Sequence, residues 1–137
     1  MHMQDVDDLN IFWAKSVDEG ESYLPLLQHA QDVTDIIEHV AHQLVAPGRL
    51  DRLQNNLGGM ELSKVLKAAA WFHDCGKISL FFQPKVCVLY GRLSKYGYRG
   101  SVTSQQMSAN PHSVVGAHAV AAWLRARAIN ANRRAMR

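Results

Sequence analysis

Apolar residues recur at helical spacing in three stretches of the chain. The first stretch covers residues 24–45 and carries one inward stripe, at steps of three and four positions. Its members are Leu26, His29, Val33, Ile36, Ile37, Val40 and Leu44. Pro25 occupies a first-turn position, and Pro47 and Gly48 follow where the periodicity ends. Because proline and glycine punctuate helices in this way, we predict a helix that begins near Pro25 and stops before Pro47.

Two further periodic stretches predict helices later in the chain. Residues 60–74 form the second, and Gly76 stands where this helix should stop. Its inward positions are Leu62, Val65, Leu66, Ala69 and Phe72 or His73. Asn110 and Pro111 introduce the third helix, over residues 112–131. We therefore expect three main helices.

The segments between these helices are less regular. A short helix is expected over residues 50–56, before the glycines at 58 and 59. Residues 86–90 fit a short strand, although no second strand is apparent to pair with it. Residues 91–111 are rich in Gly, Ser, Asn and Gln and predict a long loop. The expected fold class is all-α, as one domain over residues 1–137.

The composition indicates a globular protein with a core of its own. Hydrophobic residues make up 47% of the chain. No window reaches the roughly 18 consecutive apolar residues of a membrane span, and the acidic start lacks the features of a secretory signal. Cys75 and Cys87 have neither the spacing of a zinc knuckle nor the number of a disulfide framework. We therefore expect reduced thiols in a cytoplasmic protein without a membrane partner.

The net charge of +3 is small, but the charges are unevenly placed. Acidic residues load the start of the chain. Basic residues near its end are Arg125, Arg127, Arg133, Arg134 and Arg137. Such an end suits contact with phosphate groups, although a solvated helix face is the commoner explanation.

The most specific chemistry lies where the second helix ends, in the pair His73–Asp74. Adjacent side chains point about 100° apart in mid-helix, but at a helix end both can reach one ion or two neighbouring ions. Imidazole together with carboxylate suits Mn, Fe, Ni, Co or Zn. For an isolated dipeptide, a helix-terminal pair that binds no metal is nevertheless the commoner meaning.

Other residues strengthen the metal hypothesis. His29 lies on the inward stripe of an otherwise aliphatic face, where a lone histidine is more often a hydrogen-bonded core residue, and His112 opens the last helix. With His73 and Asp74, they occupy helical positions that could meet at one focus. Lys77 suits a substrate phosphate or developing negative charge, or is an ordinary exposed lysine. Of the remaining histidines, we expect His39 and His42 to face solvent and His118 to have a structural role. His2 lies at the terminus.

Four stretches, in order, resemble one known family. They are FWAKS at 12–16, YLPLLQHAQDV at 23–33, HDCGK at 73–77 with FFQPK at 81–85, and HSVVGAHAV at 112–120. Each stretch alone is weak, but four at fitting spacings are specific. Together they resemble the HD nuclease domain of the type I CRISPR-associated helicase-nuclease, a branch of the HD superfamily.

The resemblance implies a helical bundle with a two-metal site. His29, His73 and Asp74 would be metal ligands, with Asp74 bridging two ions and His112 binding the second. Lys77 would contact substrate phosphate or support catalysis, and Asp32 would orient a histidine, while a role for Ser79 is less defined. The ions would be Mn, Fe, Ni, Co or Mg.

The resemblance also implies a reaction and its partners. The family hydrolyses single-stranded DNA, as an endonuclease or exonuclease, during CRISPR antiviral interference. A fused or separate helicase delivers the strand, and the RNA-guided Cascade complex recruits the enzyme. Two metal ions about 3.5–4 Å apart can activate a water and stabilise a leaving oxygen, so no nucleophilic side chain is required.

The sequence departs from the family pattern after His112. The family continues with a His-His segment and a closing aspartate, whereas no aspartate follows Asp74 here. We therefore expect the N-terminal portion of an HD domain or a shortened relative, a bundle incomplete at its C-terminal end, and impaired catalysis. Apolar faces without their cover would then be exposed, and a homodimer or a partner chain would cover them.

Two other functions fit part of the pattern. An HD phosphohydrolase acting on nucleotides would share His29 and His73–Asp74, but it gives no reason for the FWAKS segment. A non-catalytic module that binds or regulates the CRISPR effector would explain the missing ligands. Metal content and a cleavage assay distinguish these alternatives from the nuclease.

Overall fold

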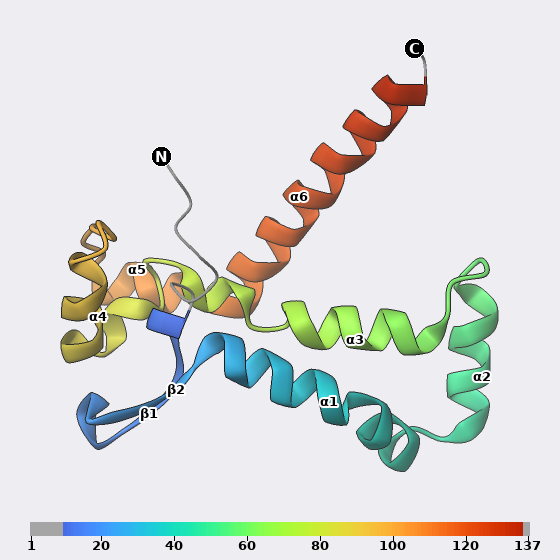
Figure 1. Ribbon diagram of the computed structural model, residues 1–137, viewed down its shortest axis with the longest axis horizontal. Coiled ribbons are helices and arrows are strands. Elements are labelled where there is room, and N and C mark those ends of the chain that lie inside the picture. Colours follow the sequence, from blue (N-terminus) through green and yellow to red (C-terminus); the bar gives the residue numbers. More distant parts are fainter. Residues whose placement is uncertain (1–9, 136–137) are drawn as a thin grey trace.

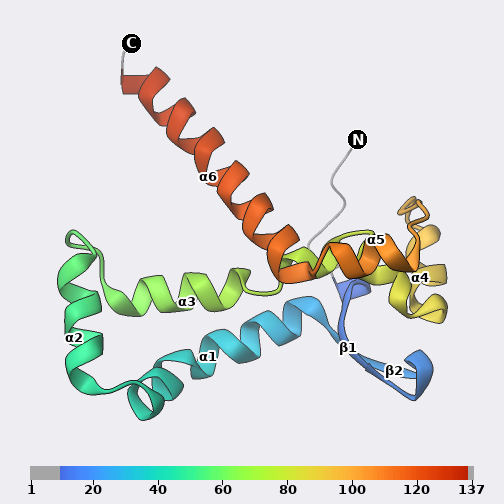
Figure 2. The ribbon, with the colours of Figure 1, turned by 180° about the vertical axis from the view of Figure 1, so that it is seen from behind.

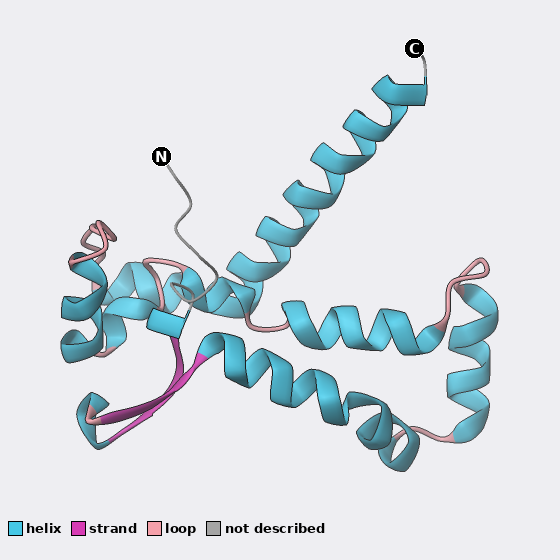
Figure 3. Ribbon diagram, in the orientation of Figure 1, coloured by secondary structure: helices cyan, strands magenta, loops and turns pink. Residues whose placement is uncertain are grey.

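The computed structural model describes residues 10–135, and it describes side chains as far as Ala128. The described residues confirm the expected all-α class (Figure 3). The helices are α1 (Leu26–Leu44), α2 (Pro47–Asn56), α3 (Leu62–Phe72), α4 (Cys87–Ser94), α5 (Ser104–Ala109) and α6 (His112–Ala135). The first, second, third and last of these correspond to the predicted helices.

Helices α1 and α3 lie side by side, and α2 crosses between their far ends (Figures 1 and 2). Leu26, Ala30 and Ala41 of α1 are buried, as is Ala70 of α3. The stripe predicted for α1 is wrong at two positions, since Ile36 and Leu44 are exposed. Helix α3 has 11 residues against 19 in α1, so it covers only part of that face.

On α3 the predicted inward positions Leu62, Val65 and Leu66 are half-buried, but the prediction is wrong toward the end of the helix. Ala70 is buried, whereas Ala69 is exposed and Phe72 is 37% exposed. The side chain of Phe72, the last residue of the helix, lies against α6. Its ring centroid is 6.0 Å from that of Trp123.

A two-stranded antiparallel hairpin, which the sequence pattern missed, precedes α1. Strand β1 covers Trp13–Val17 and strand β2 covers Ser22–Pro25. The hairpin packs its aromatic end against the chain after α3, where Trp13, Phe82 and Leu89 form a small core cluster. Only the first two residues of β1 are buried, so its sequence shows little of the alternation that reveals a strand.

The segment predicted as strand and loop, residues 86–111, contains two helices instead. The possible strand lies within α4, whose Leu89 and Leu93 are the most deeply buried apolar side chains. Val86 and Val88 favour a strand locally, but leucines four positions apart share a helix face and pack inward. Helix α5 begins with a capping box between Thr103 and Gln106.

Helix α6 starts against the segment Cys75–Ile78 and then runs away from the rest of the molecule (Figures 1 and 2). Several large apolar side chains near this junction are exposed, as the sequence led us to expect: Trp71, Phe72, Val114, Trp123 and Leu124. Cys75 and Cys87 are free thiols. None of the described helices combines the length and apolar character that crossing a bilayer requires.

Candidate metal centre

Asp74 lies at the break between two kinds of helix. Helix α3 ends at Phe72, His73 still has helical dihedral angles, and Asp74 departs from them with φ −112° and ψ 9°. A short 3₁₀ turn, Cys75–Ile78, follows at once. This change of direction lets two adjacent side chains point to the same place, as predicted for a helix end.

The Asp74 carboxylate is the meeting point of four side chains. Its Oδ2 atom lies 3.1 Å from His29 Nε2, 3.2 Å from His73 Nε2 and 2.6 Å from Lys77 Nζ. Its Oδ1 atom lies 3.2 Å from His112 Nε2. The structure therefore brings together all five residues predicted for the site.

The donor set fits a divalent transition metal. His29, His73 and Asp74 each offer one ligand atom, and these atoms lie within 4.8 Å of one another. Two imidazoles and a carboxylate form a ligand set suited to such ions. One oxygen of Asp74 is therefore approached by His29 and His73, and the other by His112.

The hydrogen bonding of His73 also favours a cation at this place. Its Nδ1 atom is bonded to the carbonyl oxygen of Ala70, which can only accept, so Nδ1 carries the hydrogen. The neutral ring then presents the lone pair of Nε2 to Asp74 Oδ2, which is also an acceptor. A divalent cation held by both acceptors would satisfy them. A backbone carbonyl that fixes a histidine in this way is typical of metal centres.

Lys77 is buried with its ammonium against Asp74. Besides the carboxylate, Nζ donates to the carbonyl oxygen of Ala14 at 3.1 Å, and it lies 5.4 Å from the centre of the Phe82 ring. Only 7% of the residue is exposed. In this arrangement Lys77 neutralises Asp74 and links it to strand β1, while the predicted contact with substrate phosphate stays a prediction.

Burial and charge act in opposite directions on these groups. Burial alone raises the pKa of Asp74, but the hydrogen bond and charge of Lys77, with smaller contributions from His73 and His112, outweigh it and lower this pKa. Burial lowers the pKa of His29, and the positive charge of Lys77 lowers it further. A carboxylate and a neutral imidazole are the forms that bind a metal.

Two glycines allow α6 to approach closely enough to deliver His112. A Cβ atom at Gly76 would overlap the carbonyl oxygen of His112, and one at Gly116 would lie 2.9 Å from the backbone nitrogen of Gly76. Any larger residue would push α6 away from the 3₁₀ turn. The sequence contains both glycines, but only the packing shows that they face each other.

Gln83 is a structural residue that the sequence reasoning quoted without giving it a role. Its side chain is fully buried, and its Nε2 donates to the carbonyl oxygens of Lys77 at 2.7 Å and Trp13 at 3.1 Å. The backbone nitrogen of Trp13 donates to its Oε1 at 3.4 Å. One amide therefore ties strand β1 to the turn that carries Lys77. A glutamine directly after two phenylalanines was the available signal.

Other predicted residues lie outside the centre. Asp32 is exposed and accepts a hydrogen bond from Gln28, so the prediction that it orients a histidine is wrong, and Ala70 does this for His73. His39, His42 and His118 are exposed. Within the described residues, the Oγ atom of Ser79 is buried without a hydrogen-bond partner. His2 lies outside the described residues.

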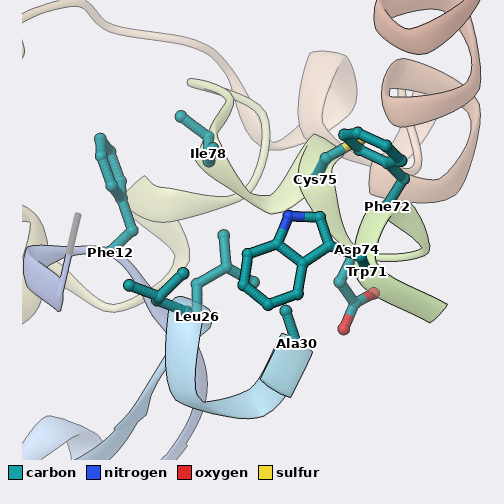
Figure 4. A pocket seen from close by; sticks show the side chains of 9 residues that line it. Phe12, Leu26, Ala30, Trp71, Phe72, Asp74, Cys75 and Ile78 are labelled. Atoms are coloured by element: carbon teal, nitrogen blue, oxygen red, sulfur yellow. The ribbon is translucent and has the colours of Figure 1, made fainter. Parts of the chain in front are cut away.

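An apolar hollow of about 180 Å³ adjoins the centre (Figure 4). It lies between the start of α1 and the end of α3, and Asp74 forms part of its wall together with Trp71, Phe72 and Cys75. In Figure 4 the Trp71 ring lies across the hollow, between Ala30 and Cys75. The hollow gives the polar centre an apolar neighbour on one side.

The domain is mainly helical, and it gathers three histidines and one aspartate from α1, the end of α3 and the start of α6, which is part of the ligand set of the HD-type metal-dependent hydrolases. Residues 13–137 match the family model described as Cas3, HD domain. Because this match covers nearly the whole chain, the chain belongs to the family of Cas3 HD domains. No curated protein and no solved structure matches it. Family membership implies a nuclease-type hydrolase that depends on divalent metal ions and works in a CRISPR system.

Proposed function

We propose that the chain hydrolyses phosphodiester bonds of single-stranded DNA in type I CRISPR antiviral interference. The observation that carries this proposal is the division of the Asp74 carboxylate. His29 and His73 approach one oxygen and His112 approaches the other. This arrangement would let Asp74 contribute one oxygen to each of two ions.

The residues of the centre supply binding, orientation and charge. His29, His73 and Asp74 would hold one ion, and Asp74 and His112 would contribute to a second. When bound, two such ions supply an activated water and stabilise the leaving oxygen of an in-line displacement. Lys77 keeps Asp74 ionised, and the Ala70 carbonyl accepts from Nδ1 of His73 and so turns its Nε2 atom toward Asp74.

The proposed partners follow from the same family membership. We expect a helicase, fused or separate, to deliver the strand, and the Cascade complex to recruit the enzyme. We also expect a cytoplasmic location.

The test joins metal content to cleavage. Purified wild-type chain should bind a divalent transition metal, and His73→Ala should lose it and lower the cleavage rate by more than the roughly 10–100-fold typical of a lost outer-sphere partner. The matched control is His39→Ala, an exposed histidine of α1 outside the centre. Metal is measured by mass spectrometry and cleavage with labelled single-stranded DNA in Mn²⁺, Co²⁺, Ni²⁺ or Mg²⁺.

Two outcomes would contradict the proposal. Equal metal content in the wild type and His73→Ala would show that His73 does not belong to a metal centre. A metal-loaded chain that hydrolyses nucleotides but not single-stranded DNA would favour the phosphohydrolase alternative, so a nucleotide panel accompanies the DNA assay.

A further inference from the structure

The two parts of the chain on either side of the centre carry opposite charge. Residues 75–137 contain ten Lys and Arg and no Asp or Glu, whereas residues 1–74 contain five Lys and Arg and twelve Asp and Glu. All the carboxylates therefore come at or before Asp74. A polyanion that approaches the centre is therefore attracted to these later segments, in which α6 carries Arg125 and Arg127.

Helix α6 belongs to this basic part of the chain, and on it an aromatic ring lies beside a guanidinium group. The guanidinium carbon of Arg127 lies 4.4 Å from the centre of the Trp123 ring. Trp123 in turn lies 6.0 Å from Phe72, the residue that immediately precedes His73. We call Phe72, Trp123 and Arg127 the aromatic face. Trp123 is 45% exposed and Phe72 37% exposed, so both rings keep surface free for a ligand.

The aromatic face is continuous with the candidate metal centre. Phe72 contacts Trp123 on one side and lines the apolar hollow on the other, and Asp74 lines the same hollow. In Figure 4 the Phe72 ring lies beside Cys75 and next to α6, while the Asp74 carboxylate lies beyond Trp71. The aromatic face and the centre therefore border the same hollow, so a chain-like ligand on the aromatic face would lie beside the centre.

We propose that the aromatic face binds unpaired bases of a single-stranded nucleic acid, with Trp123 stacking on a base and Arg127 contacting a phosphate. Exposed aromatic rings beside cationic groups are the means by which proteins bind single strands without reading sequence. A solvated helix face would explain the arginines but not the exposed Trp123 ring beneath Arg127, and an apolar face covered by a second copy would not need the arginine there. This inference rests on the proposed function for the class of ligand and adds the surface that holds it.

The test separates base stacking from phosphate contact. Two labelled strands of equal length, about 12 nucleotides and so within single-strand site sizes, are compared. One is oligothymidylate, and the other is an abasic sugar-phosphate chain. Binding is measured by fluorescence anisotropy in EDTA, so that neither metal nor cleavage is involved. The wild type should bind oligothymidylate more tightly.

Each variant has its own signature. Trp123→Ala should weaken oligothymidylate binding about tenfold and leave abasic binding unchanged, and Trp123→Phe should restore most of the loss. Arg127→Ala should weaken both strands and reduce the salt dependence by about one phosphate contact. Matched controls are Leu124→Ala, another exposed apolar residue of α6, and Arg125→Ala, which lies about 200° around the helix from Arg127. Thermal melts confirm that each variant is folded.

Several results would overturn the inference. These are equal binding of the two strands by the wild type, or equal effects of Trp123→Ala and Leu124→Ala. A dimer in sedimentation that Trp123→Ala dissociates, with DNA binding intact, would assign the face to a second copy instead. If Trp123→Ala keeps metal-dependent cleavage and its affinity for oligothymidylate, the role of the aromatic face is refuted, but the proposed enzyme function is not. Binding that depends on Trp123 in a chain without metal or cleavage would refute the proposed enzyme function alone.

Discussion

The candidate centre depends on a carboxylate that is buried together with its counter-charge. The side chains of Asp74 and Lys77 are 8% and 9% exposed, and their charged atoms lie 2.6 Å apart. A buried pair of this kind adds little net stability compared with apolar residues, but removing one partner leaves an uncompensated charge. The ammonium group of Lys77 therefore compensates the buried negative charge of Asp74, and a bound metal ion would also compensate it.

The first prediction concerns this counter-charge. In EDTA, Lys77→Met should lower the free energy of unfolding by about 3 kcal/mol, because Asp74 stays buried without its ammonium. Adding Co²⁺ or Mn²⁺ should restore part of the loss, because an ion that binds only the folded state stabilises it. Urea denaturation with and without metal measures both effects.

A surface pair provides the control. Lys64→Met breaks an ion pair with Glu61 whose side chains are 76% and 65% exposed. Its effect should stay below about 1 kcal/mol and should not respond to metal. If Lys77→Met behaves in the same way, Lys77 is not the counter-charge that holds Asp74.

At the level of elements, the approach of α6 to the 3₁₀ turn decides whether His112 joins the centre. Gly76 and Gly116 form this contact, with backbone atoms where side chains would normally lie. Glycine within a helix usually destabilises it relative to alanine. At position 116 the close packing of α6 on the 3₁₀ turn leaves no room for a Cβ atom, which outweighs that effect.

The second prediction uses two helical glycines with opposite surroundings. Gly116→Ala places a Cβ atom 2.9 Å from the nitrogen of Gly76 and 3.1 Å from Cys75 Sγ, so the free energy of unfolding should fall by about 1–3 kcal/mol. Gly91→Ala in α4 meets nothing within 4 Å and should raise it by about 0.5–1 kcal/mol. Urea denaturation compares them, and the same sign for both would contradict the close approach.

On the scale of the whole molecule, one polar centre connects four segments of the chain. Residues from α1, the end of α3 and the start of α6 meet at Asp74, and Lys77 extends the connection to strand β1. The apolar core around Trp13, Phe82 and Leu89 is small. The ionisation of this centre should therefore influence the stability of the whole chain.

The third prediction is a fall in stability on acidification. The pKa of His29 lies below its ordinary value of 6.5 in the folded chain, so the unfolded chain takes up the proton first as the pH falls below 6.5. The pKa of Asp74 is also lowered in the folded chain, so a second loss of stability follows when the pH falls below its ordinary pKa of 3.8. Thermal melts in EDTA from pH 7.5 to pH 5 should show a falling Tm.

The contribution of His29 to this fall is separable from that of other groups. His29→Gln should flatten the dependence of Tm on pH between about 7 and 5, whereas His39→Gln, at an exposed position of the same helix, should leave it unchanged. Parallel curves for the wild type and His29→Gln would show that this histidine is not held neutral by its surroundings.

The sequence by itself determined the main helices and the residues of the centre. A period of 3.6 residues is a local property, so α1, α3 and α6 were predictable, and so was the relaxation of geometry at the end of α3 that lets His73 and Asp74 converge. The order and spacing of four motifs indicated the family, which the match over residues 13–137 confirms.

Only the tertiary structure decided which surfaces meet. Strand β1 and helix α4 were mispredicted because their local propensities are weak or misleading, and packing of Trp13, Leu89 and Leu93 overrides them. The division of Asp74 between two groups of histidines requires α6 to pass within backbone contact of Gly76. Such contacts join residues about 40 positions apart, and no periodic pattern in either segment encodes the distance between them.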